Sequence, residues 1–507
     1  MKPRFLYLIL AVTLSWFCAC KEQAPQENTG FCRFLHEKCL YVTLESGSAD
    51  YFLYRGQPMG FELELIESFA AFTGCRFVIL PGESIASQLK MLEEGKTDII
   101  ASNLNITRSR QLSVAFSHPI YHSKQALVQL APAYLSDSAV YVDSWEALSQ
   151  REVSVRKNSV FEESLLAYNL PLPKNRRIRI HRSSRTEDEL IQAVSQGKLS
   201  YSLVSCNKAA HWAFTRPQID FHLQSDHVQP IAWAMHLKAD TLQELVNRWI
   251  DSLSATGTVD YLYHKYYEIA PEKTVRSVKS GFTKMDSVSF RRRMAQREML
   301  IEEGLLDESD SAFIFDIKRR STRMNPVMVG GRSISPYDRL FKKHSRQIPW
   351  DWRLLAALVY QESQFESHLV SKKGAIGLMQ MIPATARRYG ITVRSSAEDQ
   401  IEAGVKYIRA IYRSLPEEIA AEEQVYFVLA AYNIGLGHIL DARRLAAKYG
   451  ADPNRWYDNV ETYLKLKSRP EYYRDTASRN GYANGPQAVD FVRKIDERYM
   501  HYRNLVQ

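Results

Sequence analysis

Cysteine is scarce in this chain, with six in 507 residues. Zinc and similar metal sites gather Cys and His at short, characteristic spacings, such as two cysteines separated by two residues. The sequence contains no Cys-x-x-Cys motif and no Cys/His cluster with metal-site spacing. It therefore predicts no metal site.

A strong net charge is also missing. The formal charge is +9, with 24% charged and 45% hydrophobic residues, which is an ordinary globular composition. No basic run is interleaved with aromatic residues, the pattern of nucleic-acid-binding surfaces, so we exclude nucleic acid as a partner. A mildly basic surface suits an anionic cell wall or membrane. The sequence has no internal repeats, and its length indicates two or three domains.

No hydrophobic run is long enough to span a bilayer comfortably. The apolar run Phe5–Phe17 is shorter than the roughly 20 residues that a spanning helix needs. It follows Lys2 and Arg4, so residues 1–20 have the form of a signal peptide. Export permits disulfides, and Cys32–Cys39 is the expected pair because the two lie close together in the sequence.

The end of this signal peptide, Phe17-Cys18-Ala19-Cys20, resembles the lipobox of bacterial lipoproteins. The resemblance implies cleavage before Cys20 and a lipid anchor on Cys20. Modification of Cys18, or an ordinary signal peptide cut nearby, is the alternative. Lys21 points, by the same resemblance, to the outer membrane. We therefore expect a lipoprotein of the cell envelope that is attached to the outer membrane and faces the periplasm.

Strands and helices alternate at the start of the next unit, which we place at residues 40–270. Short apolar runs predict strands at Tyr41–Leu44, Phe77–Leu80 and Asp98–Ala101. Amphipathic segments between them predict helices at Gly60–Gly74 and Leu89–Gly95. This alternation indicates a parallel α/β arrangement.

Three segments of this unit, MGFELELIESFA, MLEEGKTDIIASNLNITRSRQ and VAFSHPIYHSKQALV, resemble the type 2 periplasmic solute-binding fold, in particular its polar-amino-acid branch. The resemblance implies two lobes with a ligand cleft between them. The chain would cross between the lobes near Gln125–Pro132 and Asp220–Trp233, which leaves Tyr134–Phe221 as the second lobe.

The same resemblance predicts a ligand site. Arg110 takes the place of the arginine that binds a ligand carboxylate, a task that suits a planar guanidinium. Asn103 and Asn105 occupy neighbouring positions in the cleft. Ser205 stands where the family usually has an aspartate for the ligand ammonium, which argues against a free amino acid as the ligand. A peptide or muropeptide with a blocked amine fits better.

Residues 271–334 form a charged connector with low apolar content, which we interpret as a linker. Beyond it, residues 335–507 are largely helical. Helical spacing of apolar residues predicts helices at Asp351–Glu362, Ala384–Tyr389, Ala397–Leu415, Glu422–Tyr432, His438–Tyr449, Val460–Ser468 and Gln487–Arg498.

Glu362 lies at the end of the first of these helices, directly after an apolar stripe. The negative end of the helix dipole and partial desolvation both disfavour its ionised form. A carboxyl whose pKa is raised by about two units still carries its proton near pH 6 and can act as a general acid. Most glutamates at helix ends are simply solvated, so the position alone does not define a site.

Two later motifs, taken together with Glu362, do define a site. Glu362-Ser363, Gly377-Leu378-Met379-Gln380 and Ala431-Tyr432-Asn433, in this order and spacing, resemble the soluble-lytic-transglycosylase family, whose catalytic domain has a goose-type-lysozyme-like fold. The resemblance implies that Glu362 acts first as acid and then as base on peptidoglycan, without a cofactor. The product would carry a 1,6-anhydro ring on N-acetylmuramic acid.

The family also implies roles for the neighbouring side chains. Tyr432 and Gln380 would hold the sugar, Ser363 and Asn433 would position substrate or Glu362, and Met379 would line the floor. Near the end of the domain the family often has Glu and Tyr, where this chain reads Gln487-Ala488-Val489-Asp490-Phe491. Phe491 keeps a ring without the hydroxyl, so we expect altered substrate contacts.

Two other functions fit the same sequence. A hydrolytic muramidase could use this fold with water as the nucleophile. A solute-binding sensor with an inactive second domain is the other alternative, although intact Glu362, Gln380 and Tyr432 argue against it. The full prediction is a two-lobed α/β solute-binding domain followed by a mainly α lysozyme-like transglycosylase domain.

Overall fold

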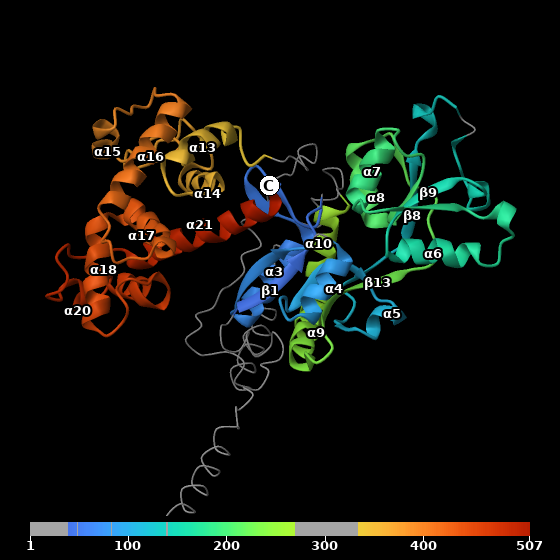
Figure 1. Cartoon of the computed structure of the whole chain (residues 1–507), viewed down its shortest axis with the longest axis horizontal. Helices are drawn as coiled ribbons and strands as arrows, with labels where there is room; N and C mark the ends of the chain where they lie inside the picture. The colour runs from blue at the N-terminus through green and yellow to red at the C-terminus, as the bar shows by residue number, and fades with distance from the viewer. Residues whose placement is uncertain (1–38, 48, 83, 138–139, 269–332, 507) are drawn as a thin grey trace, which may run out of the picture. The chain divides into compact units, whose positions relative to one another are not determined.

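The computed structural model describes residues 39–506 except 48, 83, 138–139 and 269–332 (Figure 1). The predicted signal peptide with Cys18 and Cys20, the partner Cys32 and nearly all of the predicted linker lie outside the described residues. The chain forms two compact units. Of the described residues, the first unit comprises those within 39–50 and 60–268, and the second comprises 51–59 and 333–506.

The first unit contains two sheets. One has the strand order β4-β1-β5-β13-β6, with β7 also paired to β13. Its strands β1 and β4 run parallel, and Val42 lies opposite Ile79. Antiparallel β13 completes the sheet beside β5. The strands are β1 (Cys39–Leu44), β4 (Arg76–Pro81), β5 (Ile99–Asn105), β6 (Val114–Phe116), β7 (Tyr121–Ser123) and β13 (Gln229–His236).

The second sheet has the order β10-β9-β11-β8-β12. Its strands are β8 (Gln125–Leu130), β9 (Glu152–Arg156), β10 (Arg179–Ser183), β11 (Ser202–Ser205) and β12 (Ile219–Asp220). Because β8 already pairs with β11 of this sheet, the second lobe begins at Gln125 rather than at Tyr134, and this predicted boundary is wrong. Short strands that pair in a distant sheet cannot be assigned to a lobe from local sequence.

The helices of the first unit follow their local signals. Helix α3 (Phe61–Thr73) ends at Gly74, which adopts the left-handed conformation that glycine favours at a helix end. Helix α7 (Glu187–Ser195) begins with a capping box formed by Thr186 and Glu189. The other helices are α4 (Ile85–Glu93), α5 (Arg108–Gln111), α6 (Val160–Asn169), α8 (Cys206–Thr215), α9 (Asp240–Ala255) and α10 (Thr258–Tyr266).

The second unit is mainly helical around one apolar core that includes Leu355, Leu358, Phe427 and Ile495. Its helices are α13 (Asp338–His344), α14 (Trp352–Ser363), α15 (Pro383–Arg388), α16 (Ala397–Arg413), α17 (Ala421–Ile434), α18 (Leu436–Lys448), α19 (Glu461–Leu466), α20 (Pro470–Tyr473) and α21 (Gly485–Leu505). The predicted helices are confirmed within a few residues, whereas α13 and α20 were not predicted and α21 extends beyond the predicted Gln487–Arg498.

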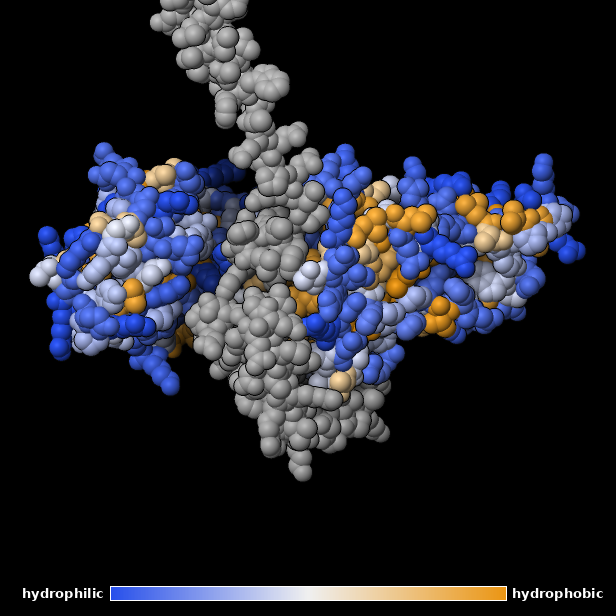
Figure 2. All heavy atoms as spheres, turned by 90° about the horizontal axis from the view of Figure 1, so that it is seen from below, coloured by the Kyte–Doolittle hydropathy of each residue, from blue (hydrophilic) through white to orange (hydrophobic). Residues whose placement is uncertain are grey.

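The described surface is largely polar. The face drawn in Figure 2 is mostly hydrophilic with separate apolar patches, and the most exposed large apolar side chains include Leu112 and Leu170 of the first unit and Tyr482 of the second. None of the helices in the described part of the chain is both long enough and apolar enough to span a membrane.

One element departs from the predicted contiguous first unit. The hairpin of β2 (Phe52–Tyr54) and β3 (Gln57–Met59) belongs to the second unit, although it lies between β1 and α3 in the sequence. The hydroxyl of Tyr502 in α21 donates a hydrogen bond of 2.5 Å to Gly56 O at the hairpin turn. Gly56 has φ +77°, and a Cβ there would lie 2.5 Å from a ring carbon of Phe365. Only glycine fits this turn against the helical core.

We predict that Gly56→Ala destabilises the second unit. The added methyl group would meet Phe365 and Tyr360 in a left-handed backbone conformation, which should cost roughly 2–4 kcal/mol. Gly450→Ala is the matched control, since Gly450 has φ +84° and nothing within 4 Å of the same position. Denaturant unfolding of the two variants measures the difference. Equal losses would show that the hairpin turn is not packed as described.

Candidate active site

Glu362 lies in the last turn of α14, as predicted. The helix begins at Asp351, whose side chain accepts a hydrogen bond from Arg353 N, and ends where Gln364 adopts the left-handed conformation. Because the helix ends there, the half-buried side chain of Glu362 lies at its C-terminal end. Burial raises the pKa of the Glu362 carboxyl to about 8, and no charged side chain of the described residues adds to this shift. The group therefore holds a proton at neutral pH.

The turn that follows α14 is fixed to it by hydrogen bonds. Buried Ser363 Oγ lies 2.9 Å from Leu378 O and 3.1 Å from Val359 O. Gln380 Nε2 donates to Gly377 O at 3.0 Å and to Leu369 O at 3.2 Å. These bonds hold Gly377–Gln380 next to the end of α14. Because Ser363 and Gln380 already bond to backbone carbonyls, both shape the wall of the site.

Gln400, in α16, supports this turn and was not predicted. Its Oε1 accepts a hydrogen bond of 2.7 Å from Leu378 N, and its Nε2 donates to Ser367 O and Ser395 O. Gly377 has φ +73°, and a Cβ there would overlap Gln400. The sequence signal for Gln400 was a polar residue on the apolar stripe of an amphipathic helix. Such a residue is buried only if its polar atoms are bonded.

Tyr432 lies at the end of α17 and faces Glu362. Its hydroxyl donates a hydrogen bond of 2.6 Å to Met379 O. Burial first, and then the nearby Glu362 charge, raise the pKa of Tyr432 well above its usual value. Tyr432 thus stays a hydrogen-bond donor at any working pH. Its ring packs against Tyr407, with centroids 5.3 Å apart, while the next residue, Asn433, is exposed at the helix end.

Two predicted contact residues lie inside the core. Met379 is fully buried, and a Cβ on Gly404 of α16 would lie 2.3 Å from the end of the Met379 side chain. Its backbone carbonyl, not its side chain, joins the site through Tyr432. Phe491 is 7% exposed and belongs to the apolar core of the second unit, so it offers almost no surface for a sugar to contact.

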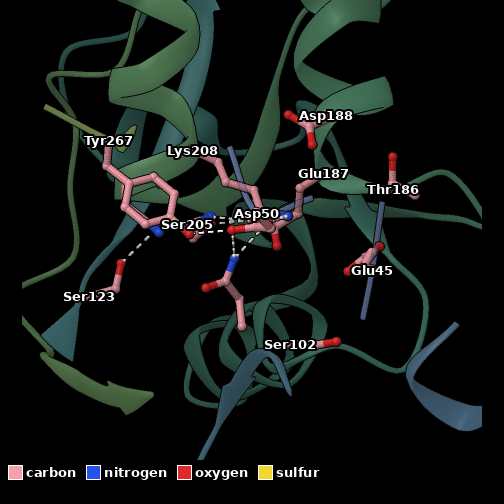
Figure 3. A network of polar contacts seen from close by, with 12 residues as sticks. Glu45, Asp50, Ser102, Ser123, Thr186, Glu187, Asp188, Ser205, Lys208 and Tyr267 are labelled. Carbon is pink, nitrogen blue, oxygen red and sulfur yellow. Dashed lines mark hydrogen bonds and ion pairs between the residues drawn. The ribbon is translucent and has the colours of Figure 1, made fainter. Parts of the chain in front are cut away.

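The predicted ligand residues of the first unit lie where the two lobes meet. Asn103 Nδ2 donates to both carboxylate oxygens of Asp50 at 3.0 Å, and Ser205 donates from its N–H and its hydroxyl to Glu187 at 2.6 Å (Figure 3). Asn105 bonds to Gln229 at 2.8 Å. These three side chains are therefore tied into the domain itself.

Arg110 is different. It is half-buried in α5, and one of its N–H groups donates to Asn105 O at 3.0 Å. Burial lowers the pKa of its guanidinium, and the charges of Glu163 and Arg156 act on it from the second lobe. A guanidinium with five N–H donors thus lies within electrostatic reach of charged groups on the opposite lobe.

Comparisons with known proteins agree with this division. Residues 45–269 match the family of bacterial extracellular solute-binding proteins, family 3. Residues 339–454 match the transglycosylase SLT domain, which includes α14, the turn at Gly377–Gln380 and Tyr432.

Curated relatives match nearly the whole chain. One from Desulfosudis oleivorans, named membrane-bound lytic murein transglycosylase F, is 28% identical over 97% of this chain and 94% of its own length. Proteins of the same name from Photobacterium profundum and Vibrio cholerae are 27% and 28% identical, over 98% and 89% of this chain and 86% and 76% of their own lengths.

Solved structures match the first unit at a lower level. An ancestral arginine-binding protein bound to arginine is 20% identical, with a TM-score of 0.40, over 45% of this chain and 98% of its own. An ancestral amino acid-binding protein, a precursor of cyclohexadienyl dehydratase, is 22% identical, with a TM-score of 0.40, over 47% of this chain and 100% of its own.

The chain thus joins a segment that matches the solute-binding proteins of family 3 to a segment that matches the transglycosylase SLT domain. Its near full-length match to membrane-bound lytic murein transglycosylases F makes it an enzyme of the lytic transglycosylase class.

The raised pKa of Glu362 predicts a pH-dependent stability difference between the native chain and Glu362→Gln. Between pH 4.5, the ordinary value, and about 8, native Glu362 binds a proton only when folded, so native stability falls with rising pH across this window. The variant lacks this loss. Its unfolding free energy relative to that of the native chain should therefore rise by about 4–5 kcal/mol between pH 4.5 and pH 8 and then stay constant. Urea unfolding at several pH values measures this, and a constant difference would contradict the assignment.

Proposed function

We propose that the second unit cleaves the β-1,4 bond between N-acetylmuramic acid and N-acetylglucosamine in peptidoglycan without water and leaves 1,6-anhydro ends. The observation that carries the proposal is the lone, desolvated carboxyl of Glu362 beside Tyr432. Retaining and inverting glycosidases commonly pair two carboxyl groups about 5–9.5 Å apart. A second carboxylate so close would add to the raised pKa of Glu362, and no carboxylate of the described residues contributes to that shift, which burial causes.

The chemistry then uses one group twice. Protonated Glu362 gives its proton to the glycosidic oxygen as the bond to the anomeric carbon breaks. The resulting carboxylate takes the proton of the C6 hydroxyl of the same sugar, and that oxygen bonds to the anomeric carbon. Glu362 ends protonated, as it began. An intramolecular hydroxyl has a very high effective molarity, so it competes well with water.

The other site residues have supporting roles in this proposal. Tyr432 and Gln380 hold the sugar, and the hydroxyl of Tyr432 lies near the reacting carboxyl. Ser363 fixes the turn against α14, and Asn433 is placed at the exposed edge to reach substrate. A buried Phe491 acts through packing. We also propose that a lipid on Cys20 attaches the enzyme to the outer membrane, facing the periplasm.

The expected result for Glu362→Gln is a loss of cleavage of at least about 1,000-fold, because both proton transfers use this group. Glu366→Gln, which removes an exposed carboxyl just after α14, is the control and should retain activity. Mass analysis of products from purified cell wall tests the reaction itself. Products that lack one water support the transglycosylase, and reducing ends would instead support a hydrolytic muramidase. No cleavage by the native chain would favour the sensor with an inactive second domain.

We propose further that the first unit senses a carboxylate-bearing peptide or muropeptide and regulates cleavage. Arg110 supports a carboxylate, since its guanidinium lies within electrostatic reach of the second lobe. Ser205 supports a ligand without a free amine, because a neutral hydroxyl stands there in place of a carboxylate that could pair with an ammonium. Binding changes cleavage only if the ligand prefers one state of the enzyme.

The Glu362→Gln chain allows the ligand to be tested without digestion. In calorimetric titrations we expect wall-derived peptides to bind more tightly than free amino acids. Arg110→Ala should weaken peptide binding by at least about tenfold, whereas Arg108→Ala, an exposed arginine in the same helix, should leave it unchanged. Cleavage by the native chain is then measured with the peptide added. Tight binding of free amino acids would contradict the proposed ligand class. Peptide binding without a change in cleavage rate would contradict the proposed regulation.

A further inference from the structure

Two buried ion pairs join the lobes of the first unit. Lys208, in α8 of the second lobe, places Nζ 3.1 Å from Oδ2 of Asp50, which follows β1 in the first lobe, and their side chains are 2% and 4% exposed. Arg156, in β9 of the second lobe, lies 2.7 Å from Glu45 of the first. Buried pairs are costly to break because each partner then remains as an uncompensated charge.

The surroundings of Lys208 carry an excess of negative charge. Four carboxylates act on its ammonium, from Asp50, Glu187, Glu45 and Asp188 (Figure 3). Burial alone would lower the pKa of Lys208, but these carboxylates raise it well above its usual value. The ammonium is therefore permanently charged and fills a pocket that would suit any primary ammonium ion.

The pocket is assembled from both lobes. Asp50 is held in place from the first lobe by Asn103 and by the hydroxyl of Tyr267, which donates a hydrogen bond to it. From the second lobe, Ser205 donates to Glu187. Gly47 brings the first-lobe backbone so close that a Cβ there would lie 2.7 Å from Asp188 Oδ2. The lobes are thus in contact here with the ammonium between them.

We propose that Lys208 is an internal ligand: its ammonium, tethered to the second lobe, occupies the carboxylate pocket at Asp50 and holds the cleft closed when no solute is bound. This goes beyond the sensing role proposed above and does not depend on the chemistry at Glu362. It has a direct consequence for specificity. A solute with a free amine meets a pocket that is already filled, so the cleft takes ligands through their anionic groups.

The experiment removes the ammonium and then returns it in solution. In the full-length Lys208→Ala chain, hydrogen exchange followed by mass spectrometry should be at least about tenfold faster than in the native chain for residues 39–47 and 203–214, because the lobes open. n-Propylammonium replaces the deleted atoms and should restore most of the protection in a saturable manner. n-Propanol, of similar size but neutral, should not, and neither should affect the native chain.

Lys198→Ala, an exposed lysine of the same lobe, is the matched control and should exchange like the native chain. If Lys208→Ala does not fold, Lys208→Met keeps most of the stem without the charge and should show the same faster exchange. Unchanged exchange in both variants overturns the proposal. Equal restoration by propanol also overturns it, because the pocket would then require bulk rather than an ammonium.

Discussion

The chemistry of the second unit depends on one physical constraint, the burial of the Glu362 carboxyl at a helix end without a counter-charge. An ion pair nearby would lower its pKa and leave it unable to donate a proton. At a fully exposed position, water would stabilise the ionised carboxylate and would likewise keep its pKa low. The half-buried position just before the left-handed Gln364 avoids both. Burial of this carboxyl thus costs the fold some stability but keeps the acid protonated. Such a cost is expected at a functional site.

The rest of the unit holds this carboxyl in place by packing small residues against long ones. Gly404 leaves room for Met379, and Gly377 leaves room for Gln400. Through these contacts α16 supports the turn that faces Glu362, although none of its residues belongs to a recognisable motif. A larger residue at either glycine would move the turn before it touched any substrate.

The sequence predicted the elements well because helical and strand periodicities are local. It also predicted Glu362, Tyr432 and the turn residues at their positions, since the motif fixes their order. Which of the motif side chains are buried was harder to predict. Phe491 and Met379 are core residues here because a helix presents its apolar face to the core, and the motif does not record which face that is. Gln400 and Lys208 were missed because their partners lie far away in the sequence.

The hairpin at Phe52–Met59 has a consequence for how the chain is made. Its turn is synthesised long before its hydrogen-bond partner Tyr502, which follows 446 residues later. Contacts this distant in sequence close late and slow the search for the native state. On the ribosome the hairpin therefore remains without its partner until those 446 residues have emerged. A chain truncated before Tyr502 would leave this early segment without the hydrogen bond that holds its turn.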